Sequence, residues 1–244
     1  MAGARGRVAF VCAMPMEMAP LRRPLSLRTS DGKPPQCYEG QFEGRPVVAV
    51  TTGMGPELAR RGLQRLFETA DDIEWVLVVG ITGAVGDATP VGTLVHPERV
   101  VDGATGDVYR PRPLAGSRPT GAMWTTADLI TDPDRLTTLK AEGVIALDME
   151  TAAIGELCDA RGIPWSVVRV ISDRAYDGSV DAELFAMSDP NGSPRPGAVV
   201  SFLLRHPGRI PTLARMGRDV RAATRRAAAV ALEEVRAAWR AEVR

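Results

Sequence analysis

The 244-residue chain has only two histidines, His96 and His206, and three cysteines, at positions 12, 37 and 158. Histidine is the side chain whose ordinary pKa lies nearest neutral pH, so acid–base chemistry in this chain is expected to rest on carboxylates. The cysteines are odd in number, lie far apart and form no Cys-x-x-Cys or Cys/His pattern. This spacing argues against a zinc site and indicates reduced thiols, which predicts a cytosolic protein.

The sequence also lacks long hydrophobic runs and an excess of charge of one sign. No segment approaches the roughly 20 apolar residues of a membrane span, and the short apolar stretch near the N-terminus runs into Pro15 and Glu17 instead of a signal-peptide cleavage site. Thirty basic residues balance thirty acidic ones, which gives no general attraction to nucleic acid or to an anionic membrane. We therefore expect a small molecule as the partner.

Strand-like and helix-like segments alternate along the chain, which is typical of an α/β fold. No linker divides two separately apolar regions, and 244 residues with 45% hydrophobic content are enough for one full core. We therefore predict a single domain over residues 1–244. The predicted strands are 8–13, 36–42, 46–51, 75–79, 91–101, 144–147 and 165–171, and a helix is predicted at 56–68.

Two segments are rich in residues that interrupt regular structure. Residues 102–121 are predicted to form a long surface loop, and residues 174–197 a loop or lid, because Gly, Pro, Asp and Asn recur in them. From about residue 211 to 241 the chain is alanine-rich and predicted to be helical. The candidate core-facing positions of that helix are Val220, Leu232, Val235 and Trp239.

Carboxylates follow three of the predicted strands: Glu17, Glu150 and Asp173. In open α/β sheets, ligands bind beyond the carboxyl ends of the strands, so these acids are candidates for one cleft. Each also has an ordinary structural interpretation. Glu17 and Glu150 could be acids in the first turn of a helix, in the second case a helix capped by Asp148, and Asp173 could cap a turn. Arg169 lies within an apolar strand, where an unpaired charge is costly. It therefore needs a carboxylate or a ligand.

The segment ALDMETAAIGELCDARGIPWSVVRVISD, residues 146–173, resembles the signature of the nucleoside phosphorylase and nucleosidase family, V-D-M-E-x-A-A followed by V-R-x-I-S-D. Ala13, Met14 and Glu17 are similar to the A-M-x-x-E stretch of the nucleosidase branch. Residues 53–55 resemble the family's G-x-G turn and residues 80–85 its glycine loop. The resemblance implies a three-layer α/β/α fold with a central twisted mixed sheet, and a homo-oligomer, most simply a dimer.

The resemblance also implies cleavage of the bond between a ribose and a purine base. Asp173 matches the general acid that, in its protonated form, hydrogen-bonds or protonates N7 of the base. Glu150 matches the carboxylate that binds the ribose hydroxyls and is expected to stay ionised. Glu17 matches the residue that orients and deprotonates the attacking water, and Arg169 an arginine near that water. No metal or organic cofactor is required by these roles.

Four further residues are assigned to the substrate by the same resemblance. Met149 is expected to pack against the sugar, and Ser172 and Gly83 to line the substrate site. Ile81 stands where nucleosidases often have serine, and Thr82 is a candidate to supply the missing hydroxyl. The candidate substrates are methylthioadenosine, S-adenosylhomocysteine and futalosine, and residues 174–217 also resemble the branch associated with hopanoid biosynthesis.

Two other functions stay open. Phosphorolysis needs an anion site made of arginines and loop amides. However, the place where many phosphorylases carry an arginine is apolar here, at Val78 and Val79, and Glu17 would repel phosphate. A nucleoside-binding protein without catalysis is the alternative of another class, because Ile81 and the C-terminal region depart from the family pattern.

Overall fold

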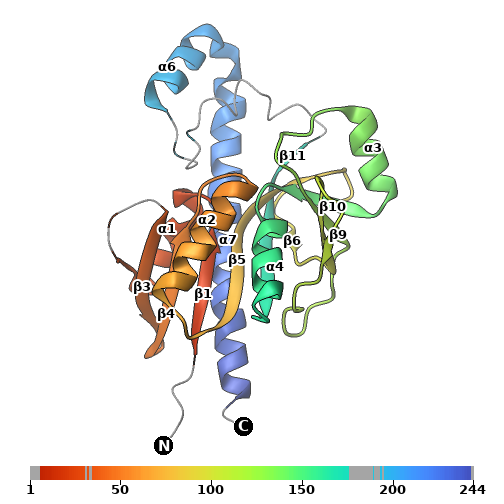
Figure 1. Ribbon diagram of the computed structural model, residues 1–244. Helices are drawn as coiled ribbons and strands as arrows, with labels where there is room; N and C mark the ends of the chain where they lie inside the picture. Colours follow the sequence, from red (N-terminus) through yellow and green to blue (C-terminus); the bar gives the residue numbers. More distant parts are fainter. Residues whose placement is uncertain are drawn as a thin grey trace, which may run out of the picture.

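The computed structural model describes residues 6–30, 32, 35–175, 189, 193 and 195–242. Eleven strands form one large mixed sheet (Figure 1), in the order β2-β3-β4-β1-β5-β10-β9-β7-β8, with β11 pairing with β5 and β6. The strands are β1 (Arg7–Cys12), β2 (Arg28–Thr29), β3 (Gln36–Phe42), β4 (Arg45–Thr51), β5 (Ile73–Ala84), β6 (Leu94–Val95), β7 (Arg99–Asp102), β8 (Val108–Tyr109), β9 (Ala122–Thr125), β10 (Val144–Asp148) and β11 (Trp165–Arg174).

Helices cover both faces of this sheet (Figure 1). They are α1 (Pro15–Arg22), α2 (Pro56–Thr69), α3 (Pro133–Ala141), α4 (Thr151–Ala160), α6 (Pro196–Arg205), the 3-10 turn η1 (Pro207–Arg209) and α7 (Ile210–Ala241). Alternate residues of β1 enter opposite cores, as the two-residue period of a strand requires. Ala9 and Val11 pack with α2 and α4, whereas Val8 and Phe10 pack with α1 and α7. The predicted α/β class with a central mixed sheet is confirmed.

Strand β5 lies at the centre of the sheet and changes partners along its length. Residues 73–78 pair in parallel with β1, residues 76–84 pair in parallel with β11, and Gly83 and Ala84 also pair antiparallel with β10. Because two strands meet its C-terminal half, residues from β10 and β11 come together there, next to α1. This branching of the sheet creates the place for the candidate site.

The strand predicted at 75–79 is longer in the structure, since β5 runs through the glycines to Ala84. The glycine at position 80 does not make a turn. A Cβ atom there would lie 2.1 Å from Oε1 of Glu17 and 2.6 Å from a terminal nitrogen of Arg169. Gly80 therefore keeps the strand close to two buried charged groups.

Two other sequence predictions were partly wrong. The strand predicted at 91–101 is divided into β6 and β7, with Pro97, which cannot donate a backbone hydrogen bond, lying between them. The predicted loop at 102–121 contains β8, whose Val108 pairs with Val101 of β7. Most of the predicted lid at 174–197 lies outside the described residues, so the lid stays a prediction, as does the single domain.

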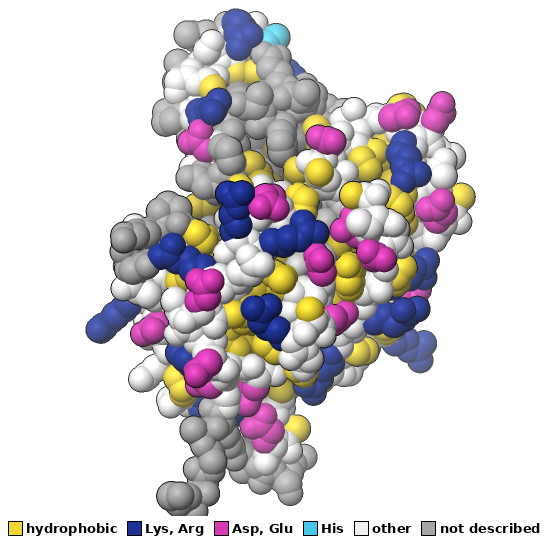
Figure 2. All heavy atoms as spheres, viewed as in Figure 1, with side chains coloured by type: hydrophobic (Ala, Val, Ile, Leu, Met, Phe, Trp, Pro, Cys, Tyr) yellow, Lys and Arg dark blue, Asp and Glu magenta, His cyan; other side chains and the backbone are white. Residues whose placement is uncertain are grey.

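Acidic and basic side chains are interspersed on the face of the molecule that Figure 2 shows. Cys12, Cys37 and Cys158 are buried thiols that form no disulfide bond. Within the described residues, no helix is both long and apolar enough to cross a membrane. The same part of the chain contains no group of three or more His, Cys, Asp or Glu residues arranged to hold a metal ion.

The long C-terminal helix was predicted correctly, but the residues on its buried face were predicted only in part. Val235 and Trp239 are buried, whereas Leu232 and Val220 are only partly so. Small residues make up the rest of this face, which lets α7 lie close to β5 and β11. They are Ala223, Thr224, Ala227, Ala228 and Ala231.

We predict that Ala227→Leu lowers the free energy of unfolding by about 1–3 kcal/mol, because a larger side chain must force the helix away from the sheet. Ala227 has 0% exposure. Ala229, two residues along the same helix, is exposed, and Ala229→Leu is the matched control, expected to change stability by less than about 0.5 kcal/mol. Urea unfolding measures both. Equal losses in the two variants would contradict this packing.

Candidate active site

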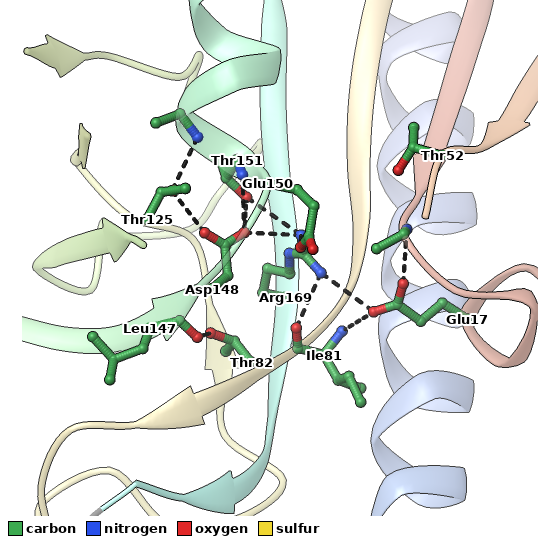
Figure 3. Close-up of polar contacts among 12 residues, drawn as sticks. Glu17, Thr52, Ile81, Thr82, Thr125, Leu147, Asp148, Glu150, Thr151 and Arg169 are labelled. Carbon is green, nitrogen blue, oxygen red and sulfur yellow. Dashed lines mark hydrogen bonds and ion pairs between the residues drawn. The ribbon is translucent and has the colours of Figure 1, made fainter. Parts of the chain in front are cut away.

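Arg169 is the centre of a buried ionic cluster (Figure 3). It lies in β11 between Val168 and Val170, and its side chain is 2% exposed. One terminal nitrogen contacts Oε1 of Glu17 at 3.2 Å and donates to the Ile81 carbonyl at 3.0 Å. The other contacts Oδ2 of Asp148 at 2.9 Å and Oε2 of Glu150 at 3.3 Å. The expectation that this arginine has a carboxylate partner is confirmed.

Glu17 is fully buried in the first turn of α1, and four donors reach its carboxylate. Oε2 accepts the backbone N–H groups of Ala13 and Met14, each at 2.9 Å. Oε1 accepts the Ile81 N–H at 2.8 Å and the contact from Arg169. Burial raises the pKa of Glu17, although the Arg169 charge and the three backbone donors oppose this shift. The side chain is thus held firmly, yet its pKa lies above that of an ordinary glutamate.

Glu150 joins the family-like segment to the glycine turn before α2. Its Oε1 accepts the N–H of Gly55 at 2.8 Å, and its Oε2 contacts Arg169. Gly55 has a φ of 99°, a conformation that favours glycine, so the turn presents its N–H to the carboxylate. Sequence reasoning identified both features but had no way to pair them across 95 positions.

The pKa of Glu150 is raised to about 7, which differs from the expectation that it stays ionised. Burial is the main cause, and the negative charges of Asp148 and Glu17 add to it, whereas Arg169 and the Gly55 N–H oppose it. Without a ligand, a substantial fraction of Glu150 is therefore protonated at neutral pH. The charge contribution to this shift arises because three carboxylates share one guanidinium.

Asp148 is the member of the cluster that sequence reasoning missed. It was interpreted only as a possible helix cap, and its Oδ2 does accept the N–H of Thr151, the first residue of α4, at 3.1 Å. It also pairs with Arg169 and accepts a hydrogen bond from Thr125 Oγ1 at 2.7 Å. The available signal was its position at the end of a strand, the same signal that marked Glu150.

Asp173 lies in β11, one residue before the strand ends, and is paired with Gly83. The strand therefore continues past its predicted end at Ile171 and ends at Arg174. Asp173 is partly exposed, and its Oδ1 accepts a hydrogen bond from the Ser172 hydroxyl. A Cβ atom on Gly83 would lie 3.2 Å from its Oδ2, so the glycine leaves room beside this carboxylate.

The Thr82 hydroxyl has a structural partner. It donates to the Leu147 carbonyl at 2.6 Å and so ties β5 to β10. Because the hydroxyl proton is used there, Thr82 can offer a water molecule only a lone pair. In its predicted role as a replacement for the family's serine, Thr82 could therefore accept a hydrogen bond but not donate one.

All of the predicted site residues line one open cavity, and the structure thus brings them together from four distant segments. Sequence reasoning did not anticipate the apolar side chains that line it beside the acids. Its described lining residues are Ala13, Met14, Glu17, Met54, Ile81, Thr82, Gly83, Thr126, Asp128, Leu129, Ile130, Leu147, Asp148, Met149, Glu150, Arg169, Ser172, Asp173 and Ala175.

Ionisation of Glu150 is expected to cost stability. Its folded-state pKa is raised from 4.5 to about 7, so the cost is absent below the lower value, grows between the two and is complete above the higher one. The full shift corresponds to roughly 3 kcal/mol. We predict that Glu150→Gln, which resembles the protonated acid, raises the free energy of unfolding by up to about 3 kcal/mol at pH 8 and by much less at pH 5.

Urea unfolding at the two pH values tests this prediction. Glu156→Gln is the control, because Glu156 forms a solvent-accessible pair with Arg60, and surface pairs contribute about 0–1 kcal/mol. A gain for Glu150→Gln that is the same at pH 5 and pH 8 would show that the carboxylate carries no raised pKa.

Comparison with known proteins shows to which family the chain belongs. A 5′-methylthioadenosine/S-adenosylhomocysteine nucleosidase of Haemophilus influenzae (strain PittEE) is 26% identical over 197 residues, which are 68% of this chain and 86% of that protein. The structure of a nucleosidase of the same name from Neisseria meningitidis, in complex with methylthio-immucillin-A, superposes with a TM-score of 0.73 at 16% identity and covers 95% of this chain and 99% of that one.

A futalosine hydrolase mutant of Helicobacter pylori superposes almost as well, with a TM-score of 0.70 at 12% identity over 94% of this chain and 98% of that one. At such identities these structures establish the fold and do not distinguish between substrates. The family model described as the phosphorylase superfamily matches residues 7–129 and 118–205. The chain therefore belongs to the phosphorylase superfamily.

Proposed function

We propose that this protein hydrolyses the bond between ribose and base in a purine nucleoside with a substituted 5′ carbon, of the methylthioadenosine or S-adenosylhomocysteine kind. The observation that carries the proposal is the charge of the cavity. Among its described lining residues, Arg169 is the only positively charged one, and three carboxylates already contact it. A dianionic phosphate would find no uncommitted cation there, whereas water needs none.

In the proposed reaction, Glu17 acts as the general base. Its raised pKa brings it closer to the operating pH, where a base is most effective. All four of its acceptor positions are filled in the ligand-free site, so one donor must leave before water can bind. The Arg169 contact, at 3.2 Å, is longer than the three backbone contacts, and it is the one we expect to exchange for water.

Asp173 acts as the general acid at the other end of the bond. Water adds to C1′ of the ribose and gives its proton to Glu17, while the bond between C1′ and N9 breaks and the proton of Asp173 passes to N7. The base then leaves neutral, and the sugar leaves with a new hydroxyl group on C1′. The excess negative charge of the cluster favours the positive charge that develops on the sugar in the transition state.

Glu150 and Met149 are proposed to hold the ribose, the first through its hydroxyls and the second by packing. Both line the cavity next to the carboxylates, and ionised oxygens bind a diol more strongly than neutral ones. Ser172, Thr82 and Gly83 are proposed to border the substrate. The homodimer and the cytosolic location stay predictions.

The first test is base release from 5′-methylthioadenosine, S-adenosylhomocysteine, adenosine and inosine, with and without phosphate. We expect free adenine from the 5′-substituted adenosines at a rate that phosphate does not change, because water is the nucleophile. Release only with phosphate would identify a phosphorylase. Binding without release would identify a nucleoside-binding protein.

The second test separates the roles of the acids by steady-state kinetics. Glu17→Gln and Asp173→Asn are expected to lower kcat by roughly 10²–10⁴-fold, the usual contribution of a general acid or base. Glu150→Gln should act mainly on KM, since it removes a contact to bound sugar. Wild-type kcat in Asp173→Asn would exclude that residue as the acid, and an unchanged kcat in Glu17→Gln would exclude that glutamate as the base.

A further inference from the structure

The three carboxylates around Arg169 differ in what else they contact. Asp148 makes the shortest contact with the guanidinium, 2.9 Å against 3.2 Å for Glu17 and 3.3 Å for Glu150. Its side chain is 2% exposed, and its remaining acceptor positions are filled by Thr125 and Thr151, from β9 and α4. Asp148 is therefore fixed on all sides by parts of the fold that do not depend on a ligand.

Glu17 and Glu150 must meet ligand atoms in the proposed reaction, one through water and the other through ribose. Glu17 has to loosen its contact with one terminal nitrogen of Arg169 to take up water, because its other acceptor positions are filled. Glu150 still has open acceptor positions, but it would loosen its contact with the other terminal nitrogen if a ribose hydroxyl bound at Oε2. If both did so without another anion nearby, the buried guanidinium would be left unpaired, which is strongly unfavourable. A third carboxylate that keeps its contact with the guanidinium avoids this cost.

We infer that Asp148 is the positioning residue of this site: it anchors Arg169 permanently, so that Glu17 and Glu150 can exchange their contacts with the arginine for water and ribose. This inference rests on the proposed function. It assigns the three acids of the cluster separate tasks, two toward the ligand and one toward the fold.

The electrostatics agree with this division. Burial lowers the pKa of Arg169, but the charges of the three acids raise it more, and Asp148 contributes the most among them. Asp148 also raises the pKa of Glu150, which faces Arg169 and Glu17 as well. Removing the Asp148 charge should therefore leave Glu150 ionised at lower pH and bind it more tightly to Arg169, where it is less available to ribose.

The experiment measures binding of 5′-methylthioadenosine by calorimetry between pH 5.5 and 8.5, in an Asp173→Asn background that prevents turnover. In this background we expect affinity to fall as the pH drops through about 7, where Glu150 takes up a proton. Adding Asp148→Asn should weaken binding at pH 8 by about tenfold and move the midpoint of this fall down by about one pH unit.

Thr125→Val is the matched control, because it removes a neutral donor to Asp148 and leaves the charge in place. It should lower stability without moving the midpoint. The shift of the midpoint reports the lost charge, and the loss of affinity reports the anchoring role. A purely structural role of Asp148 predicts undiminished affinity at pH 8 in folded Asp148→Asn, and that result would overturn the inference. Should Asp148→Asn fail to fold, Asp148→Glu keeps the charge but displaces it, and undiminished affinity in that variant would equally overturn it.

The proposed function and the anchoring role of Asp148 can be excluded separately. If the Asp173→Asn protein binds no nucleoside at any pH, the proposed function is wrong, and the role of Asp148 falls with it. If it binds with the expected pH dependence and Asp148→Asn changes nothing, the function stands and only the anchoring role is excluded.

Discussion

The burial of one guanidinium among three carboxylates is the constraint on which the rest of this structure depends. Arg169 is carried into the sheet by the apolar strand β11, and Glu17, Asp148 and Glu150 reach it from α1, the end of β10 and the start of α4. Strand β5 passes close to Glu17 and Arg169 at Gly80. Only glycine fits at this position, since even a methyl group would collide with both side chains. The glycine turn before α2 is fixed to the same cluster through the Gly55 N–H.

This arrangement is poor for stability and well suited to the proposed chemistry. Burial raises the pKa of Glu17 and of Glu150, and at Glu150 the charges of Asp148 and Glu17 add to this shift. Their ionised forms are therefore costly to the fold. The excess of negative charge in the cluster repels phosphate and favours a sugar that becomes cationic. Active sites commonly hold such strain because the surrounding fold over-determines them. Here the large mixed sheet and the packed helix α7 hold the four charged side chains in place.

Much of the fold and of the candidate site could be predicted from the sequence, because apolar runs mark strands and acids at their ends mark a cleft. Glu17, Glu150, Asp173 and Arg169 were selected in this way, together with the family-like motif, and the structure brings them to one cavity. What could not be predicted were contacts that depend on tertiary geometry. A glycine in a straight strand looks like a turn in sequence, as at position 80, and an aspartate before a helix looks like a cap, as at position 148. The Thr82 hydroxyl had an acceptor, the Leu147 carbonyl, 65 positions away.

In the proposed function, the cluster around Arg169 leaves no place for phosphate, and water is the nucleophile. The most direct test is mass spectrometry of the sugar formed from 5′-methylthioadenosine in concentrated phosphate buffer. The account predicts free 5-methylthioribose as the only sugar product. Formation of 5-methylthioribose 1-phosphate would contradict the proposed hydrolysis, because phosphate would then have bound a cation although three carboxylates already contact Arg169.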